Sequence, residues 1–134
     1  MPESPKKILI IDDDPFFLRL LTDSFSESGF EVFSAYDGVE GVGVYMETLP
    51  DAVLCDLVMP RMGGAETCEE IGRLAGDNQP VMVMVSSTFQ NESPHEHDVA
   101  ELGARVHISK TTSPVDVVII VEQLLERDRY LQGC

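Results

Sequence analysis

Four short apolar runs in this sequence each stop at charged or hydroxyl side chains. The runs cover residues 8–11, 52–55, 81–85 and 106–108, and runs of this kind are typical of buried parallel strands. The polar groups that follow them are Asp12 and Asp13, Asp56, Ser86 and Lys110. If the strands share one sheet, these groups meet at its carboxyl edge, where open α/β sheets bind ligands.

Between these runs the apolar residues recur with helical spacing, so strand and helix signals alternate along the chain. A second strand is expected at residues 30–35 and the third at residues 51–56. Helix starts are marked by Asp14-Pro15, Ser93-Pro94 and Ser113-Pro114. The predicted core positions are Leu18, Leu21 and Phe25 in the first helix, Val39, Val42 and Met46 in the second, Cys68, Ile71 and Ala75 in the third, and Val117, Val121, Leu124 and Leu125 in the fifth.

The length and charge of the chain limit its number of domains and its binding partners. We expect 134 residues to form a single domain, 1–134, with a core over about 6–128 and residues 129–134 as a tail or the start of a linker. A formal net charge of −15 disfavours nucleic acid and anionic membranes as direct partners. No segment reaches transmembrane length, no signal peptide follows Met1, and three cysteines indicate a reduced, cytoplasmic setting.

Three carboxylates at one sheet edge would repel one another and stay ionised only beside a cation. A cluster of oxygen ligands favours a hard ion such as Mg²⁺. A lysine ammonium and a serine hydroxyl are groups that bind phosphoryl oxygens. The residues alone therefore predict a site for Mg²⁺ and a phosphoryl group.

Several motifs, in order along the chain, carry a resemblance to a known family. They are Ile8-Leu9-Ile10-Ile11-Asp12-Asp13-Asp14-Pro15, Leu54-Cys55-Asp56-Leu57-Val58-Met59-Pro60, Gly63-Gly64, Met84-Val85-Ser86-Ser87, and Gly103-Ala104 followed by Lys110. Through them the chain resembles a response-regulator receiver domain of two-component signalling, similar to the chemotaxis regulators. The resemblance implies a flavodoxin-like three-layer sandwich: a doubly wound, five-stranded parallel sheet in the order 2-1-3-4-5, flanked by five helices.

The resemblance also implies a function and a metal site. Asp56 aligns with the aspartate that takes a phosphoryl group from a sensor histidine kinase or a histidine phosphotransfer protein, so the chain would be a signalling domain and not a conventional enzyme. Asp13, Asp56 and the backbone carbonyl of Val58 are implied as Mg²⁺ ligands. Asp12 is implied to act on the metal through a water molecule.

The phosphoryl group and the switch are assigned in the same way. Lys110 and the Ser86 hydroxyl are implied to bind phosphoryl oxygens, with a backbone N–H near Ser87 as a further donor. Ser86 and His107 are then implied to repack the surface of helix four, strand five and helix five. A downstream protein or a second copy of the chain would bind that surface.

The chain departs from the family pattern at a few positions. Thr111 stands where the family usually has proline, Gly63 replaces a common acid, and His107 replaces an aromatic residue that turns inward on activation. His107 has a second interpretation, as a half-exposed strand histidine. His95 and His97 are interpreted as solvated. These departures bear on switching more than on phosphorylation.

Two other classes of function remain as alternatives. One is a pseudo-receiver that binds partners without phosphorylation, against which the complete set of acids, serine and lysine argues. The other is an aspartyl-phosphate hydrolase or a flavin-binding protein of the same fold. The hydrolase needs a second acid soon after its nucleophile, but Leu57 and Val58 follow Asp56. The flavin protein needs a first loop rich in glycine and hydroxyl groups, where this chain has three acids.

Overall fold

The computed structural model describes residues 4–86 and 106–132, with side chains up to residue 128. These residues form one five-stranded parallel sheet in the order β2-β1-β3-β4-β5, which confirms the predicted topology. The strands are β1 (Lys7–Ile11), β2 (Glu31–Ala35), β3 (Ala52–Asp56), β4 (Val81–Ser86) and β5 (Val106–Ser109). The helices described are α1 (Pro15–Glu27), α2 (Gly38–Thr48), α3 (Gly64–Ala75) and α5 (Pro114–Gln132). The helix predicted from Ser93-Pro94 lies outside the described residues, as do Ser87, His95 and His97.

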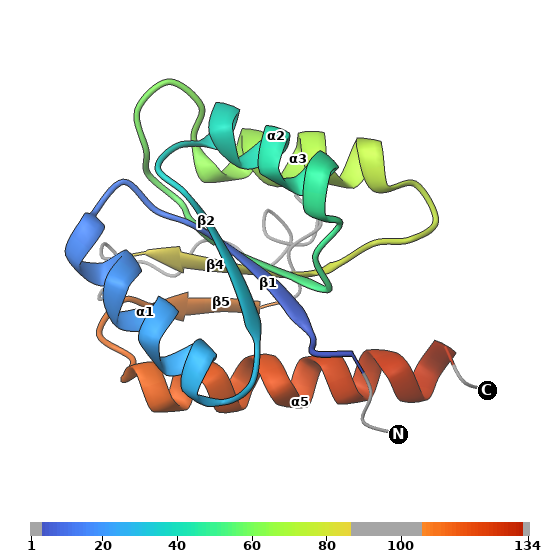
Figure 1. Cartoon of the computed structure of the whole chain (residues 1–134). Helices are drawn as coiled ribbons and strands as arrows, with labels where there is room; N and C mark the ends of the chain where they lie inside the picture. The colour runs from blue at the N-terminus through green and yellow to red at the C-terminus, as the bar shows by residue number, and fades with distance from the viewer. Residues whose placement is uncertain (1–3, 87–105, 133–134) are drawn as a thin grey trace.

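Helices cover both faces of the sheet, with α1 and α5 on one face and α2 and α3 on the other (Figure 1). A strand covered on both faces needs apolar residues at nearly every position. β3 and β4 meet this need, since all of their residues are buried. The continuous apolar runs of the sequence therefore reflect this three-layer packing. None of the helices described is both long and apolar enough to cross a membrane.

Strand register carries the polar residues to one edge of the sheet. The pairs nearest that edge are Ile11 with Cys55, Asp56 with Val85, and Ser86 with Ser109. Asp12 follows β1 directly, and Lys110 follows β5 directly. The carboxyl ends of β1, β3, β4 and β5 thus place an acid, an acid, a hydroxyl and an ammonium side by side.

α1 and α5 begin as predicted. The Asp14 carboxylate caps α1 by accepting the backbone N–H of Phe16 at 3.0 Å. The Ser113 hydroxyl accepts the N–H of Asp116 at 3.2 Å at the start of α5. The predicted core positions that are buried in these two helices are Leu18, Leu21, Phe25, Val117 and Val121.

α2 packs differently from the prediction. Val39 and Met46 are 51% and 58% exposed, and the buried positions are Gly38, Gly41 and Tyr45. The glycines cause the difference, because a Cβ on Gly41 would lie 2.5 Å from Cδ1 of the buried Ile11. The helix approaches β1 through its glycine face, and Val39 and Met46 consequently face outward.

Two strands begin one residue later than predicted. The N–H of Phe30 donates to the carbonyl of Phe25 at 3.0 Å and completes the end of α1, before β2 begins. The Asp51 carboxylate accepts the backbone N–H of Lys7 at 2.8 Å, before β3 begins. Phe30 therefore closes a turn, whereas the backbone of Asp51 bonds to Lys7 at 2.9 Å and to Val81 at 3.0 Å where the ladder begins.

The glycines of α2 give a matched test of this packing. Gly41→Ala should lower the free energy of unfolding by about 1–2 kcal/mol, because the new methyl group overpacks against Ile11. Gly43→Ala, which meets no atom within 4 Å, should raise it by up to about 1 kcal/mol through helix propensity. Chemical denaturation measures both changes. An equal increase in the free energy of unfolding in both variants would contradict the close approach of α2 to β1.

Candidate functional site

Three carboxylates lie together at the carboxyl edge of the sheet. Asp12 and Asp56 are buried and Asp13 is exposed, and one oxygen from each lies within 4.8 Å of the others. Asp12 and Asp13 follow β1, and Asp56 is the last residue of β3. The structure therefore brings together the three acids that the sequence suggested for a metal.

Backbone hydrogen bonds beyond the end of β1 fix Asp12. Its N–H donates to the carbonyl of Ala35 at 3.0 Å, which extends the ladder between β1 and β2 by one residue. Its carboxylate accepts the N–H of Asp14 at 2.9 Å. Asp14 therefore has two roles: its backbone N–H holds the Asp12 carboxylate, and its own carboxylate caps α1.

Hydrogen bonds of the two residues that follow Asp56 fix its position. Its carboxylate accepts the N–H of Val58 at 3.3 Å, and the N–H of Leu57 donates to the carbonyl of Val85 at 2.8 Å. Gly64, the first residue of α3, packs against the same peptide, since a Cβ there would lie 2.2 Å from the Asp56 carbonyl oxygen. A residue with a side chain would push α3 away from this acid.

Lys110 joins the two buried acids. Its Nζ lies 3.0 Å from Oδ2 of Asp12 and 3.1 Å from Oδ2 of Asp56. Its backbone N–H donates to the Ser86 carbonyl at 3.1 Å. The ammonium also lies 4.8 Å from the centre of the Phe17 ring, a distance at which cation–π attraction operates. The position of this lysine is thus set by α1, β1, β3 and β4 together.

Burial governs the charge state of these groups. Loss of water raises the pKa of Asp12 and of Asp56 above the ordinary value, although hydrogen bonds, including those from Lys110, oppose the rise. Desolvation alone would lower the pKa of Lys110, but its hydrogen bonds and charge interactions with the two acids together raise it. Ionisation of both acids is therefore less favourable than it would be in water, and a further cation would favour it.

The other predicted site residues lie at or near the same edge. Ser86 is buried at the end of β4, and Val58 is exposed two residues after Asp56. His107 is half-buried in β5, where it pairs in register with Met84, and burial lowers its pKa. This placement fits a half-exposed strand histidine, and its switching role stays a prediction.

The sequence interpretation did not single out Phe17, although this residue lies three positions after Asp14 and one helical turn before Leu21. It also missed the turn after β5, where the hydroxyls of Ser109 and Thr111 lie 2.7 Å apart and the N–H of Thr111 donates to Ser109 Oγ at 3.1 Å. These hydrogen bonds order the segment at which the family usually has proline.

A further missed contact joins the loop after β3 to α2. Arg61, whose φ is 67°, forms an ion pair with Asp37, the N-cap of α2. The N–H of Glu40 and then the Arg61 guanidinium hold the pKa of Asp37 below its ordinary value. The partners are 24 residues apart, so no local sequence signal marks the pair.

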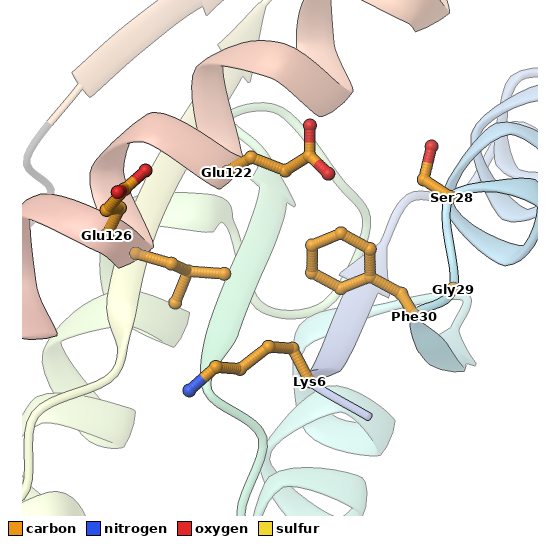
Figure 2. A pocket seen from close by; sticks show the side chains of 7 residues that line it. Lys6, Ser28, Gly29, Phe30, Glu122 and Glu126 are labelled. Atoms are coloured by element: carbon orange, nitrogen blue, oxygen red, sulfur yellow. The ribbon is translucent and has the colours of Figure 1, made fainter. Parts of the chain in front are cut away.

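A pocket of about 280 Å³ lies away from the acids. Figure 2 shows Glu122 and Glu126 of α5 above it, with Phe30 and Lys6 on the remaining sides. Lys6 precedes β1 and Phe30 precedes β2, so this pocket is at the amino edge of the sheet. It is separate from the carboxylate site.

The donor chemistry of the carboxylate site fits Mg²⁺. Carboxylate oxygens are the hard ligands that this ion prefers, and the exposed Asp13 leaves one side of the cluster open to solvent. Burial raises the pKa of Asp12 and of Asp56, so their charged forms are less favourable there than in water. A divalent cation would favour those charged forms.

The raised pKa of Asp56 leads to a pH-dependent prediction. As pH rises from about 4, the unfolded chain ionises this acid before the folded chain does, so folding loses stability until the raised pKa is passed. Asp56→Asn removes this loss, and its thermal stability relative to the parent should increase from pH 4 to pH 7. Addition of Mg²⁺ should reduce the difference by stabilising the parent.

Asp77→Asn, on the exposed turn after α3, is the matched control. Its thermal stability should change with pH as that of the parent does. Thermal unfolding at each pH, with and without Mg²⁺, makes the measurement. An advantage of Asp56→Asn that shrinks as pH rises would mean that the folded protein favours the ionised acid.

Comparison with known proteins agrees with this geometry. Residues 8–122 match the response regulator receiver domain family. The chain is 32% identical over 129 residues to the response regulator MprA of Mycobacterium sp. strain KMS, covering 96% of this chain and 54% of that protein. It is 31% identical over 123 residues to MprA of Mycobacterium tuberculosis H37Ra, covering 92% of this chain and 52% of that protein. The chain thus spans about half the length of the curated relatives it matches.

Solved structures show the same similarity. A CheY-like receiver domain protein from Methanospirillum hungatei matches with a TM-score of 0.84 and 26% identity, over 95% of this chain and 98% of that one. CheY in the CheX–CheY–BeF3–Mg²⁺ complex from Borrelia burgdorferi matches with a TM-score of 0.79 and 28% identity, over 90% of this chain and 89% of that one. The family match, the sheet order and the acidic edge agree, and this chain belongs to the response regulator receiver domain family.

Proposed function

We propose that this chain is the phosphoacceptor of a two-component phosphorelay and that Asp56 receives the phosphoryl group. The observation that carries the proposal is the position of Lys110, whose ammonium lies 3.0 and 3.1 Å from two buried carboxylates beside the exposed Asp13. A carboxylate is a weak nucleophile, so its attack needs a donor whose negative charge is neutralised. This edge of the sheet offers that neutralisation together with a nucleophile.

The transfer forms one bond and breaks one. A carboxylate oxygen of Asp56 attacks the phosphorus, a P–O bond forms, and the P–N bond to the donor histidine breaks as its electron pair returns to the imidazole. The donor is a phosphohistidine of a sensor histidine kinase or of a histidine phosphotransfer protein. A small acyl phosphate can take its place, and then a P–O bond breaks.

Asp13 and Asp56, with the backbone carbonyl of Val58, would hold Mg²⁺, and Asp12 would act on it through a water molecule. The ion supplies charge neutralisation and alignment of the phosphoryl oxygens when it is bound. Lys110 would turn from Asp56 Oδ2 to a phosphoryl oxygen, which keeps its charge paired. The Ser86 hydroxyl, with a backbone N–H near Ser87, would bind another phosphoryl oxygen.

Labelling tests the acceptor. Incubation with acetyl phosphate and Mg²⁺ should add one phosphoryl group to the chain, and Asp56→Asn should take none, because Asp12 and Asp13 are assigned to the metal ion. Intact mass and peptide mapping measure the product. The control Asp77→Asn should be labelled like the parent. A phosphoryl group mapped to any residue other than Asp56 would refute the assignment.

The proposed output is a change in the face of helix four, strand five and helix five, of which the structure describes β5 and α5. The phosphoryl group adds about two negative charges at the end of β4, and Lys110 and Ser86 are the contacts that differ between the two states. Ser86 ends β4 and Lys110 directly follows β5, the strand that carries His107. A downstream protein or a second copy of the chain would bind the altered face.

Amide hydrogen exchange tests the switch. Phosphorylation should change exchange chiefly between residues 86 and 125, because Ser86 and Lys110 move toward the new phosphoryl group. Ser86→Ala should still be labelled at Asp56 but should show a smaller change. Asp56→Asn treated with the same donor is the control for effects of the reagent. Changes confined to the loops after β1 and β3 would mean that phosphorylation does not alter this face.

A further inference from the structure

Three sulfur atoms from three different elements meet in the core between the sheet and α3. Cys55 is on β3, Met84 is on β4 and Cys68 is on α3, and each is at most 1% exposed. We call these residues the sulfur cluster. Cys55 and Cys68 are both free thiols.

Register and direct contacts place the three sulfurs against one another. Cys55 and Met84 are paired in the parallel ladder and belong to the same core cluster, so their side chains leave the sheet as neighbours on one face. Cys68 Sγ lies 3.4 Å from Met84 Sδ. Cys55 and Cys68 belong to the same buried core cluster as Met84, and the Cys55 thiol also lies 3.5 Å from the Asp56 carbonyl oxygen. Met84 is thus the neighbour of Cys55 in the ladder and of Cys68 across the core.

We propose that Cys55, Cys68 and Met84 form a binding site for a soft monovalent cation, Cu(I). Two thiols and a thioether are soft ligands of the kind that select Cu(I), whereas hard ions such as Mg²⁺ prefer oxygen. Zinc would need a fourth ligand for its tetrahedral geometry. A three-sulfur set suits a trigonal ion.

The distance between the Cys68 and Met84 sulfurs is close to what such an ion requires. Metal–thiolate bonds of about 2.3 Å around a trigonal ion place the sulfurs about 4 Å apart. The Cys68–Met84 distance would open by roughly half an ångström, which the flexible methionine side chain accommodates. One thiol proton leaves to solvent as the ion enters, so one thiolate, one thiol, one thioether and Cu(I) together carry no net charge.

The loop after β3 lies between this core cluster and the surface. Leu57 and Met59 on this loop are half-buried and pack against the same core cluster. Met59 adds a fourth sulfur at this partly exposed boundary. The peptide between Cys55 and Asp56 separates the sulfur cluster from the acidic site, so the two sites use opposite ligand chemistry on adjacent residues.

Competition for Cu(I) tests the proposal. The reduced protein is titrated without oxygen against a coloured Cu(I) chelator such as bicinchoninate. The parent, Asp56→Asn and Cys134→Ala should each withdraw one equivalent of Cu(I), and Cys68→Ala should withdraw none. Failure of the parent to compete, binding that persists in Cys68→Ala, or loss of binding in Asp56→Asn or Cys134→Ala would overturn the proposal.

Met84→Leu is a second test, because Cys68→Ala could lose Cu(I) binding by unfolding. Leucine nearly conserves the volume of methionine in the core and removes only the thioether. This variant should keep the circular dichroism spectrum of the parent and bind Cu(I) at least about tenfold more weakly, as expected for a lost ligand. X-ray absorption of the copper-loaded parent should show sulfur neighbours alone. Unchanged affinity in Met84→Leu, or oxygen ligands on the metal, would contradict the three-sulfur site.

Discussion

The bridge from Lys110 to Asp12 and Asp56 is the interaction on which the site depends. Two carboxylates lie in a place where burial opposes their ionisation, and one ammonium within 3.0 and 3.1 Å of them limits the cost. The lysine is positioned in turn by the Phe17 ring and by the Ser86 carbonyl. Because one cation serves two acids, the cluster has an affinity for positive charge before any ligand arrives.

Much of the fold could be predicted, because its strands are buried on both faces and therefore appear as continuous apolar runs. The clustering of the acids with Lys110 was predictable for the same reason, since each of these runs ends at or next to one of these polar residues. The face of α2 was predicted wrongly because helical spacing of Val39 and Met46 suggested a core, while Gly38 and Gly41 permit a closer approach. Contacts such as Arg61 with Asp37 depend on the folded arrangement of two loops, which no local pattern records.

The chain around Asp56 also separates two kinds of chemistry. The acidic edge presents oxygen atoms, partly open to solvent through Asp13, and the interior next to it presents sulfur atoms at most 1% exposed. Gly64 lets α3 approach the peptide of Asp56, and the same helix carries Cys68. The position of α3 therefore affects both environments.

The hydrogen-bond ladder of the sheet does not stop where the strands do. Asp12 binds Ala35, Leu57 binds Val85, and Lys110 binds Ser86, each through backbone atoms at 2.8–3.1 Å. These hydrogen bonds join the residues that follow β1, β3 and β5 to the neighbouring strands, and they resist stretching within the plane of the sheet. Displacements in that plane must be shared by neighbouring loops, whereas motion perpendicular to it bends these hydrogen bonds with little stretching. A displacement of one site loop within the sheet is therefore passed to the strand or loop beside it.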